Sequence, residues 1–343
     1  QTLLTQSGNS KVTRPSVLVL ASDALFPHFF GEEARKKLDE VTDWQRSPLR
    51  QDTPELRTQI ASSDVLMTTW HSPFLTAEML GAEPRVKLIA HCGGEVKSRV
   101  AEKVFEYVTV TNAADPMARG VAEMALALTL TLARKVPEYA SEMGKGVVRT
   151  NEDVSTGETL FGRRVGLVAF GRIGRAFAKL IEPFGVELLV SDPYSEREVV
   201  TGNGGTLLGL DELVSSCSVI VLAAALTPET TNLLDARRIS LMADGTYLIN
   251  VARGGLIDIA ALTAELRAGR LSAALDVTDP LEPLPIDHEL RALNNVILTP
   301  HIAAGGIEMR REIGALAVEE VVRFARGQSP CNPVTREMLA TMT

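Results

Sequence analysis

Three side chains in the second half of the chain are of the types needed to bind a carboxylate and move a proton. Arg253 and His301 each come just after an apolar run, and Glu282 lies between them in the sequence. An arginine donates two parallel hydrogen bonds to a carboxylate, and a histidine gives and takes a proton near neutral pH. A carboxylate beside an imidazole orients the ring and raises its proton affinity. These residues therefore favour acid–base chemistry on a small substrate that carries a carboxylate.

A glycine-containing turn upstream of these residues predicts a dinucleotide site. An apolar run, Val165–Phe170, enters the turn Gly171-Arg172-Ile173-Gly174, and an amphipathic segment follows. A second apolar run, Val186–Val190, ends close to Asp192. We therefore expect a strand, a helix and a second strand in the arrangement that binds a dinucleotide.

Each residue of this motif has a physical reason to contact the cofactor. Gly171 lets the backbone approach a pyrophosphate because it has no Cβ, and Gly174 lets the helix pack closely on the strand. The start of the helix, with Arg172 and Ile173, offers N–H groups and a positive dipole end to the phosphates. Asp192 lies 18 positions after Gly174. Its carboxylate can accept hydrogen bonds from the adenosine ribose and repel a 2′-phosphate, which favours NAD over NADP.

The motif departs from the usual G-x-G-x-x-G pattern at its first position, which is Ala169 here. That position forms the tight turn, and an alanine can replace the glycine if its φ stays negative. We expect cofactor binding to be somewhat weaker or shifted, and not lost.

Composition limits the class of protein. The 343 residues are 45% hydrophobic and 23% charged with a net charge of −8, which is typical of a globular chain with two domains. The absence of basic runs argues against nucleic acid, and no apolar stretch reaches the roughly 18 residues of a membrane span. Cys92, Cys217 and Cys331 have no metal-ligand spacing, so no metal is expected. The polar segment Gln1–Pro15 and the unpaired thiols favour a cytoplasmic location.

Two series of alternating strands and helices are expected to position these residues. The strands of the first series are predicted at Val17–Leu20, Val65–Thr69, Val86–Ala90 and Val108–Val110. Its helices are predicted at Phe29–Leu38 and Thr76–Leu80. The strands of the second series are predicted at Val165–Phe170, Val186–Val190, Val219–Ala223, Thr246–Asn250, Ala273–Leu275 and Val296–Leu298.

Long helices and an irregular connection complete the expected elements. Asp115 is an N-cap candidate and Pro116 suits the first helical position, so a helix is predicted from about Met117 to Lys135, with Pro137 ending it. A polar connection is expected at Gly144–Gly157. The last long helix is predicted from Gly306 to Arg326 and closed by Gly327.

In their order and content, several motifs resemble the D-isomer-specific 2-hydroxyacid dehydrogenase family. They are residues 165–176 (VGLVAFGRIGRA), 191–194 (SDPY), 226–234 (LTPETTNLL), 250–258 (NVARGGLID), 274–285 (ALDVTDPLEPLP) and 298–306 (LTPHIAAGG). The segments 122–128 (AEMALAL) and 332–339 (NPVTREML) extend the resemblance, and the first hundred residues match only loosely.

The resemblance implies an α/β protein with two doubly wound parallel-sheet domains. A Rossmann-type NAD-binding domain, residues 116–305, would be inserted into a flavodoxin-like substrate domain made of residues 1–115 and 306–343. The implied reaction is hydride transfer between NAD(H) and a D-2-hydroxy acid or its 2-oxo acid. A homodimer is also implied, through the helix Met117–Lys135 and the stretch Gly144–Gly157.

The resemblance also assigns the site residues. Arg253, Glu282 and His301 correspond to the catalytic set of the family. Glu282 is one residue later than the commoner spacing, because Leu281 is inserted, so Asp279 is the alternative partner of the histidine.

Four further residues receive binding roles. Gly93 and Gly94, in the loop 90–96, would bind the substrate carboxylate through their backbone N–H groups together with Arg253. Ala252 and Asp276 would contact the cofactor.

Two other functions share this fold. One is an NAD(H)-responsive corepressor, which binds without turning over a substrate. The other is a formate- or phosphonate-type dehydrogenase. The sequence does not identify the 2-oxo acid.

Overall fold

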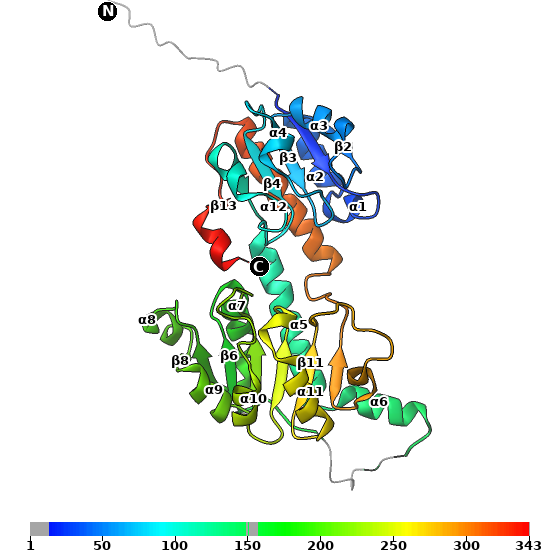
Figure 1. Ribbon diagram of the computed structural model, residues 1–343, viewed down its shortest axis with the longest axis vertical. Helices are drawn as coiled ribbons and strands as arrows, with labels where there is room; N and C mark the ends of the chain where they lie inside the picture. The colour runs from blue at the N-terminus through cyan, green and yellow to red at the C-terminus, as the bar shows by residue number, and fades with distance from the viewer. Residues whose placement is uncertain (1–13, 149, 151–156, 343) are drawn as a thin grey trace, which may run out of the picture. The chain divides into compact units, whose positions relative to one another are not determined.

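The computed structural model describes residues 14–148, 150 and 157–342. The chain forms two compact units, one with the chain up to Pro116 and from Ile307 onward, and one from Met117 to Gly306 (Figure 1). Residues 149 and 151–156 of the expected connection lie outside the described residues.

The first unit is built on a six-stranded sheet in the order β13-β5-β4-β3-β1-β2. Its strands are β1 Ser16–Leu20, β2 Asp43–Ser47, β3 Val65–Thr68, β4 Leu88–His91, β5 Thr109–Thr111 and β13 Pro333–Val334. All neighbours pair in parallel except β13, which is antiparallel to β5. The order of the first five strands is that of flavodoxin-like sheets, as predicted.

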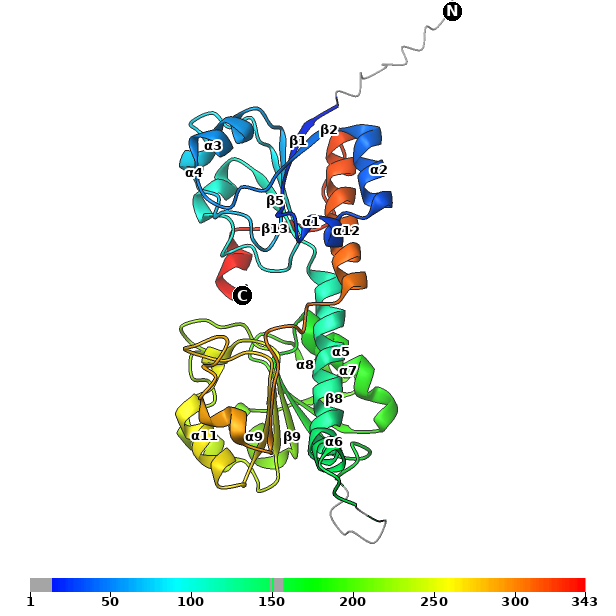
Figure 2. The same cartoon turned by 90° about the vertical axis from the view of Figure 1, so that its right-hand side faces the viewer.

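Helices cover both faces of this sheet. They are α1 Phe26–Phe29, α2 Glu32–Val41, α3 Pro54–Ala61, α4 Ala77–Leu80 and α12 Ile307–Ala325. Figure 2 shows α2 and α12 together on one face and α3 and α4 on the other. A Cβ on Gly314 of α12 would collide with the backbone carbonyl of Phe29, so only glycine lets α12 pack this closely on α1.

Two predictions for this unit were wrong or incomplete. The single helix expected at Phe29–Leu38 is two helices, because Gly31 has an extended backbone, with ψ 176°, and caps the start of α2. Strand β2, with the sequence DWQRS, was not predicted because it lies at the sheet edge and is mostly exposed, so it has no apolar run.

The second unit is built on a seven-stranded parallel sheet in the order β12-β11-β10-β9-β6-β7-β8. Its strands are β6 Arg164–Val168, β7 Glu187–Ser191, β8 Gly205–Leu207, β9 Val219–Leu222, β10 Tyr247–Asn250, β11 Ser272–Leu275 and β12 Val296–Leu298. Strands β7 and β8 lie on one side of β6 and β9 to β12 lie on the other, which is the Rossmann arrangement.

Two apolar layers hold this sheet between helices. The helices are α5 Ala114–Ala133, α6 Val136–Gly144, α7 Arg172–Ile181, α8 Arg197–Thr201, α9 Leu210–Ser216, α10 Ala236–Leu241 and α11 Ile259–Arg267. One buried cluster joins α5 and α7 to the sheet, and a second joins α9, α10 and α11 to it. The predicted class, two doubly wound α/β sheets, is confirmed.

The ends of the long helix differ from the prediction. Helix α5 begins at Ala114, so Asp115 lies in its first turn and is not its N-cap. Pro137 does not end that helix but lies at the start of α6, where a proline needs no N–H partner. Lys135, with φ 52°, makes the turn between the two helices. No helix in the described ranges is long and apolar enough to cross a membrane.

Candidate active site

The carboxyl ends of three neighbouring parallel strands bring the predicted catalytic residues to one sheet edge. Strands β10, β11 and β12 are adjacent, with Asn250 level with Leu275 and Leu275 level with Leu298. Arg253 follows β10 and His301 follows β12. Ligands of open α/β sheets bind outside this edge.

Glu282 and His301 form a direct pair. The carboxylate Oε2 of Glu282 lies 3.0 Å from Nδ1 of His301. The side chains are 36% and 45% exposed, so the pair is open to small molecules. The histidine is thus paired with Glu282, not with Asp279. Because Nδ1 faces the carboxylate, Nε2 is the ring atom that remains for proton exchange.

The inserted residue is accommodated by a tight turn. The hydroxyl of Thr278 donates to the carbonyl of Leu281 at 2.6 Å, and the Thr278 N–H donates to Oε1 of Glu282 at 3.3 Å. Leu281 itself is exposed. The extra residue therefore projects outward, and the Glu282 carboxylate still reaches the histidine.

Arg253 is half-buried, and its Nη1 donates to the carbonyl of Ala252 at 2.7 Å. The following residue, Gly254, packs against the backbone of Thr278 and Asp279, where any Cβ would collide. The loop that carries Arg253 is therefore in contact with the loop that leads to Glu282.

Two buried polar side chains at the strand ends bind these loops. Asn250 is fully buried; its Oδ1 accepts from the Ala252 N–H at 3.0 Å and its Nδ2 donates to the Arg253 carbonyl at 2.9 Å. Asp276 is only 1% exposed and accepts hydrogen bonds from the loop around His301. The predicted contacts of Ala252 and Asp276 with the cofactor stay predictions.

The turn after β6 has the features of a pyrophosphate site. Helix α7 begins after Gly171, and no side chain caps its first N–H groups. A Cβ built on Gly171 would meet nothing within 4 Å, so open space lies beside the helix start, where Arg172 and Ile173 follow. A Cβ on Gly174 would lie 2.5 Å from the carbonyl oxygen of Ala169, so glycine is required there for packing. A dinucleotide fits this turn.

The condition given for alanine at this position, a negative φ at Ala169, is not met. Its φ is 75°, a left-handed conformation that costs an alanine about 1–2 kcal/mol. Two bonds fix the residues around it. The N–H of Ala169 donates to the Ser191 carbonyl at 2.9 Å, and the Phe170 N–H donates to the Asp192 carboxylate at 2.7 Å. The surrounding turn therefore imposes a conformation that suits the glycine of the usual motif.

Asp192 lies where a ribose is expected, and its carboxylate also accepts hydrogen bonds from neighbouring loop residues. Besides Phe170, its carboxylate accepts from the Tyr194 N–H at 2.8 Å and the Ser195 hydroxyl at 3.0 Å. A carboxylate has about four acceptor positions, so a further hydrogen bond can still be accepted. Its role in cofactor choice stays a prediction.

Gly93 and Gly94 lie in the first unit, in the loop after β4. The Gly93 carbonyl accepts from the Ala113 N–H at 2.8 Å, and the Gly94 carbonyl accepts from the Asn112 amide at 2.6 Å. A Cβ on Gly93 would collide with the ring of His91, so only glycine fits this turn.

Two ionisable residues beside this loop are unsuited to catalysis. His91 is buried with Nδ1 2.8 Å from the Thr68 hydroxyl, and burial lowers its pKa to about 3, which keeps the ring neutral. Burial raises the pKa of the Cys92 thiol far above neutrality, so it is not a nucleophile. Within the described part of the chain, no cluster of three His, Cys, Asp or Glu side chains could hold a metal ion.

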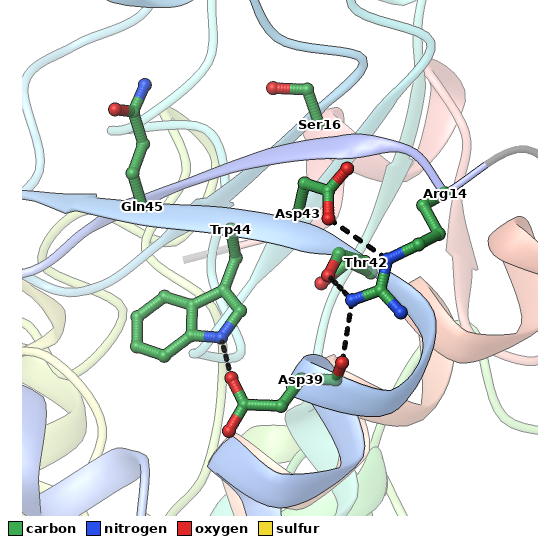
Figure 3. Close-up of a pocket in the computed structure, with 7 residues that line it drawn as sticks. All are labelled: Arg14, Ser16, Asp39, Thr42, Asp43, Trp44 and Gln45. Atoms are coloured by element: carbon green, nitrogen blue, oxygen red, sulfur yellow. Dashed lines mark hydrogen bonds and ion pairs between the residues drawn. The ribbon is translucent and has the colours of Figure 1, made fainter.

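One surface pocket of the first unit is separate from all the predicted site residues (Figure 3). Its arginine, Arg14, donates to the carbonyls of Asp39 at 2.7 Å and Thr42 at 2.5 Å and pairs with the Asp43 carboxylate. Trp44 donates from Nε1 to the Asp39 carboxylate at 2.7 Å. These bonds connect the end of α2 to β2, so we interpret the residues of the pocket as structural and not as a binding site.

Comparison with known proteins identifies the family. A family model described as D-isomer specific 2-hydroxyacid dehydrogenase, NAD binding domain, matches residues 126–303. The chain belongs to this family. The resemblance noted in the motifs is thereby confirmed, and this dehydrogenase is an oxidoreductase that acts on CH–OH groups with a nicotinamide cofactor.

Individual relatives differ in how much of their length is matched. The dehydrogenase is 33% identical to a glyoxylate reductase of Thermococcus onnurineus, over 80% of this chain and 83% of that protein. It is 32% identical to a D-3-phosphoglycerate dehydrogenase of Methanocaldococcus jannaschii, over 93% of this chain but only 59% of that protein. The crystal structure of the TT0316 protein from Thermus thermophilus is similar with a TM-score of 0.78 at 31% identity, covering 93% of this chain and 100% of that one.

No role was predicted for Asn250 or for Thr299, whose hydroxyl donates to Asp276 at 2.6 Å. The signal that could have found them is a polar residue at or just beyond the end of a buried strand, because such a group must find internal hydrogen-bond partners.

Proposed function

We propose that this dehydrogenase interconverts a D-2-hydroxy acid and its 2-oxo acid with NAD(H), using Arg253, Glu282 and His301 as its catalytic set. The observation that carries the proposal is the 3.0 Å contact between His301 Nδ1 and Glu282 Oε2 at the sheet edge that also presents Arg253. A histidine oriented by a carboxylate is suited to general acid–base work.

In the proposed mechanism, the proton passes through Nε2 of His301. During oxidation Nε2 accepts the proton of the substrate hydroxyl, and during reduction it returns a proton to the carbonyl oxygen. Glu282 accepts the Nδ1 hydrogen bond, which fixes the tautomer and stabilises the imidazolium. The nicotinamide supplies the hydride chemistry when it is bound.

Arg253 orients the substrate by its carboxylate. Its planar guanidinium can donate two parallel hydrogen bonds to both carboxylate oxygens. The backbone N–H groups at Gly93 and Gly94 are proposed to bind the same carboxylate, because two successive glycines allow these groups to converge on an anion.

For the cofactor we propose NAD rather than NADP. The pyrophosphate would lie at the uncapped start of α7, in the open space beside Gly171. Asp192 follows β7, where a carboxylate accepts from ribose hydroxyls and repels a 2′-phosphate. Ala252 and Asp276 would lie near the nicotinamide.

We further propose that the active form is a homodimer. Helix α6 has no buried residue, and it carries exposed apolar side chains at Val136 and Met143. Exposed apolar side chains concentrated on one helix are typical of a surface covered by a partner.

A panel of 2-oxo acids with NADH or NADPH, followed by nicotinamide absorbance, tests the function. The panel includes glyoxylate and 3-phosphohydroxypyruvate, which fit the names of the two relatives, and larger apolar 2-oxo acids. NADH should be preferred by at least about tenfold, or roughly 1.4 kcal/mol. If the protein binds NADH but turns over none of the 2-oxo acids, the proposal is contradicted.

A further inference from the structure

We propose that Glu320 is a positioning residue, which holds the loop of Gly93 and Gly94 in the conformation that binds the substrate carboxylate. It acts through two asparagines, Asn332 and Asn112, and all of these residues belong to the first unit. The proposal rests on the proposed role of this loop in substrate binding. The proposed proton transfer does not use Glu320.

Glu320 is the charged member of a helix side that is otherwise apolar. The buried residues of α12 include Ile313, Ala317 and Val321 at helical spacing, and Glu320 beside them is only 2% exposed. A buried carboxylate is costly unless hydrogen bonds compensate its charge. Helix α12 also packs against β4, the strand that leads into the loop of Gly93. Glu320 therefore needs donors of its own, and the helix that carries it supports the strand before the loop.

Three N–H donors converge on the carboxylate of Glu320. Its Oε1 accepts the Asn332 N–H at 2.8 Å and the Asn332 side-chain amide at 2.8 Å. The Cys331 N–H lies 3.1 Å from both carboxylate oxygens. Hydrogen bonds to an ionised acceptor are stronger than neutral ones. Glu320 therefore fixes both the backbone and the side chain of Asn332.

Asn332 is in turn bonded to the segment that holds the glycine loop. Its carbonyl accepts the Asn112 N–H at 3.2 Å, and the strand that follows it, β13, pairs with β5. The side-chain amide of Asn112 donates to the Gly94 carbonyl at 2.6 Å. The Ala113 N–H donates to the Gly93 carbonyl at 2.8 Å. The carbonyls of both glycines are thus fixed by one short segment, which Asn332 and β13 hold in place.

Fixed carbonyls determine where the N–H groups of the loop point. A peptide unit is planar and trans, so its N–H points opposite to its carbonyl. The Gly93 carbonyl shares a peptide unit with the Gly94 N–H, and the Gly94 carbonyl shares one with the Glu95 N–H. Both carbonyls face the segment of Asn112 and Ala113, so both N–H groups face away from it, where an anion can accept from them. Without Glu320, this orientation would loosen.

The main test is Glu320→Ala, which removes the acceptor of all three donors. We expect KM for an accepted 2-oxo acid to rise by roughly tenfold or more, because the substrate must then order the loop as it binds. The value of kcat should stay near wild type, since the contact with the carboxylate is made equally before and during the reaction. Glu320→Gln should restore most of the wild-type KM, because its amide oxygen can replace Oε1, which accepts both bonds from Asn332.

This division between KM and kcat distinguishes positioning from a role in stability alone. A variant that only destabilises the fold would reduce the fraction of active enzyme, so its apparent kcat would fall while KM stayed unchanged. Glu319→Ala is the matched control, because it removes an exposed carboxylate from the neighbouring position of the same helix and should change neither constant.

Two further variants test the intermediate residues. Asn332→Ala removes only the side-chain bond to Glu320, so it should raise KM by a smaller factor than Glu320→Ala does. It also keeps the proposal testable if Glu320→Ala does not fold. Asn112→Ala removes the bond to the Gly94 carbonyl. Combining it with Glu320→Ala should raise KM by less than the product of the two single effects, because residues that act through the same bonds are not additive.

Amide hydrogen exchange tests the connection without turnover. The N–H groups of Asn112 and Ala113 are donors in this series of bonds, so they should exchange faster in Glu320→Ala than in the wild type or in Glu319→Ala. If their exchange or the KM is unchanged in Glu320→Ala, or if kcat falls while KM does not rise, the positioning role is overturned. If the wild type turns over no 2-oxo acid but the exchange behaves as expected, the proposed reaction fails and the control of the loop by Glu320 is supported.

Discussion

At the residue scale, the contact between His301 and Glu282 determines where a proton can move. His301→Ala should lower the rate by roughly 10²–10⁴-fold, the usual effect of removing a positioned acid or base, while NADH still binds. Glu282→Gln should shift the pH profile, because the imidazolium loses its carboxylate partner. Steady-state kinetics across pH and a fluorescence titration of NADH measure both effects. If the His301→Ala variant keeps near-normal activity, His301 is not the proton carrier.

Arg253 is tested by a substitution that keeps its charge. Lysine is a point donor without the planar fork, so Arg253→Lys should reduce kcat/KM for every accepted 2-oxo acid by well over tenfold. Loss of a charge-assisted pair typically costs about 2–5 kcal/mol. The NADH dissociation constant should be nearly unchanged. A variant with normal KM and kcat would remove Arg253 from the substrate site.

Candidate catalytic residues could be proposed from the sequence, and the partner expected for His301, Glu282, is the one that contacts it, although Asp279 stayed open as an alternative. Motif order was enough to select Arg253 and His301. The partner of His301 depended on how the turn from Thr278 to Glu282 closes around the inserted Leu281, which is a matter of three-dimensional hydrogen bonding. The left-handed φ of Ala169 likewise follows from bonds to the neighbouring strand and its loop, which the local sequence does not encode.

At the element scale, the start of α7 gives a matched pair of alanine substitutions. Gly171→Ala places a methyl group in open space at a φ of −69°, so the free energy of unfolding should change little while NADH binding weakens. Gly174→Ala forces a contact with the Ala169 carbonyl, so it should destabilise the fold by about 1–3 kcal/mol, as over-packing does. Urea unfolding and NADH titration distinguish them. Unaltered NADH affinity in Gly171→Ala would place the pyrophosphate elsewhere.

Central strands were predictable because both of their faces are buried. The runs that form β6, β9 and β10 contain almost only apolar residues, as parallel strands between two helical layers require. The edge strands β2 and β8 lack this signal because part of each is exposed. Pro137 was misinterpreted because a proline two residues beyond the predicted helix end at Lys135 can equally begin the next helix.

At the scale of the whole molecule, buried His91 should make stability depend on pH. Its pKa is about 3 in the folded state against a usual 6.5, so between these values the unfolded chain binds more protons. The contribution of His91 to the free energy of unfolding is therefore fully present above about pH 6.5. Below that value it falls as the pH decreases, by at most about 1.4 kcal/mol per pH unit.

Tryptophan fluorescence can follow this effect in the first unit alone. The chain has 2 tryptophans, Trp44 and Trp70, and both belong to that unit. Urea unfolding at pH 7.5 and pH 5.5 should show a loss of stability in the wild type and a smaller loss in His91→Gln. The interval lies above the range in which carboxylates titrate. Equal losses in the two proteins would show that His91 is not the responsible group.

The proposed dimer gives the last prediction at this scale. The exposed side chains of α6 include Met143 at 63% and Val136 at 51%. If a second copy covers these side chains, the wild type should sediment at twice the chain mass of 37.0 kDa. The double variant Val136→Glu/Met143→Glu should shift the protein toward the monomer, because burying two charges in an apolar interface is costly. Ile286→Glu is the matched control, since Ile286 is 90% exposed in a loop outside α6 and should leave the dimer intact. Sedimentation at micromolar concentration decides: a monomeric wild type, or a dimer that survives both glutamates, would mean that α6 is not the interface.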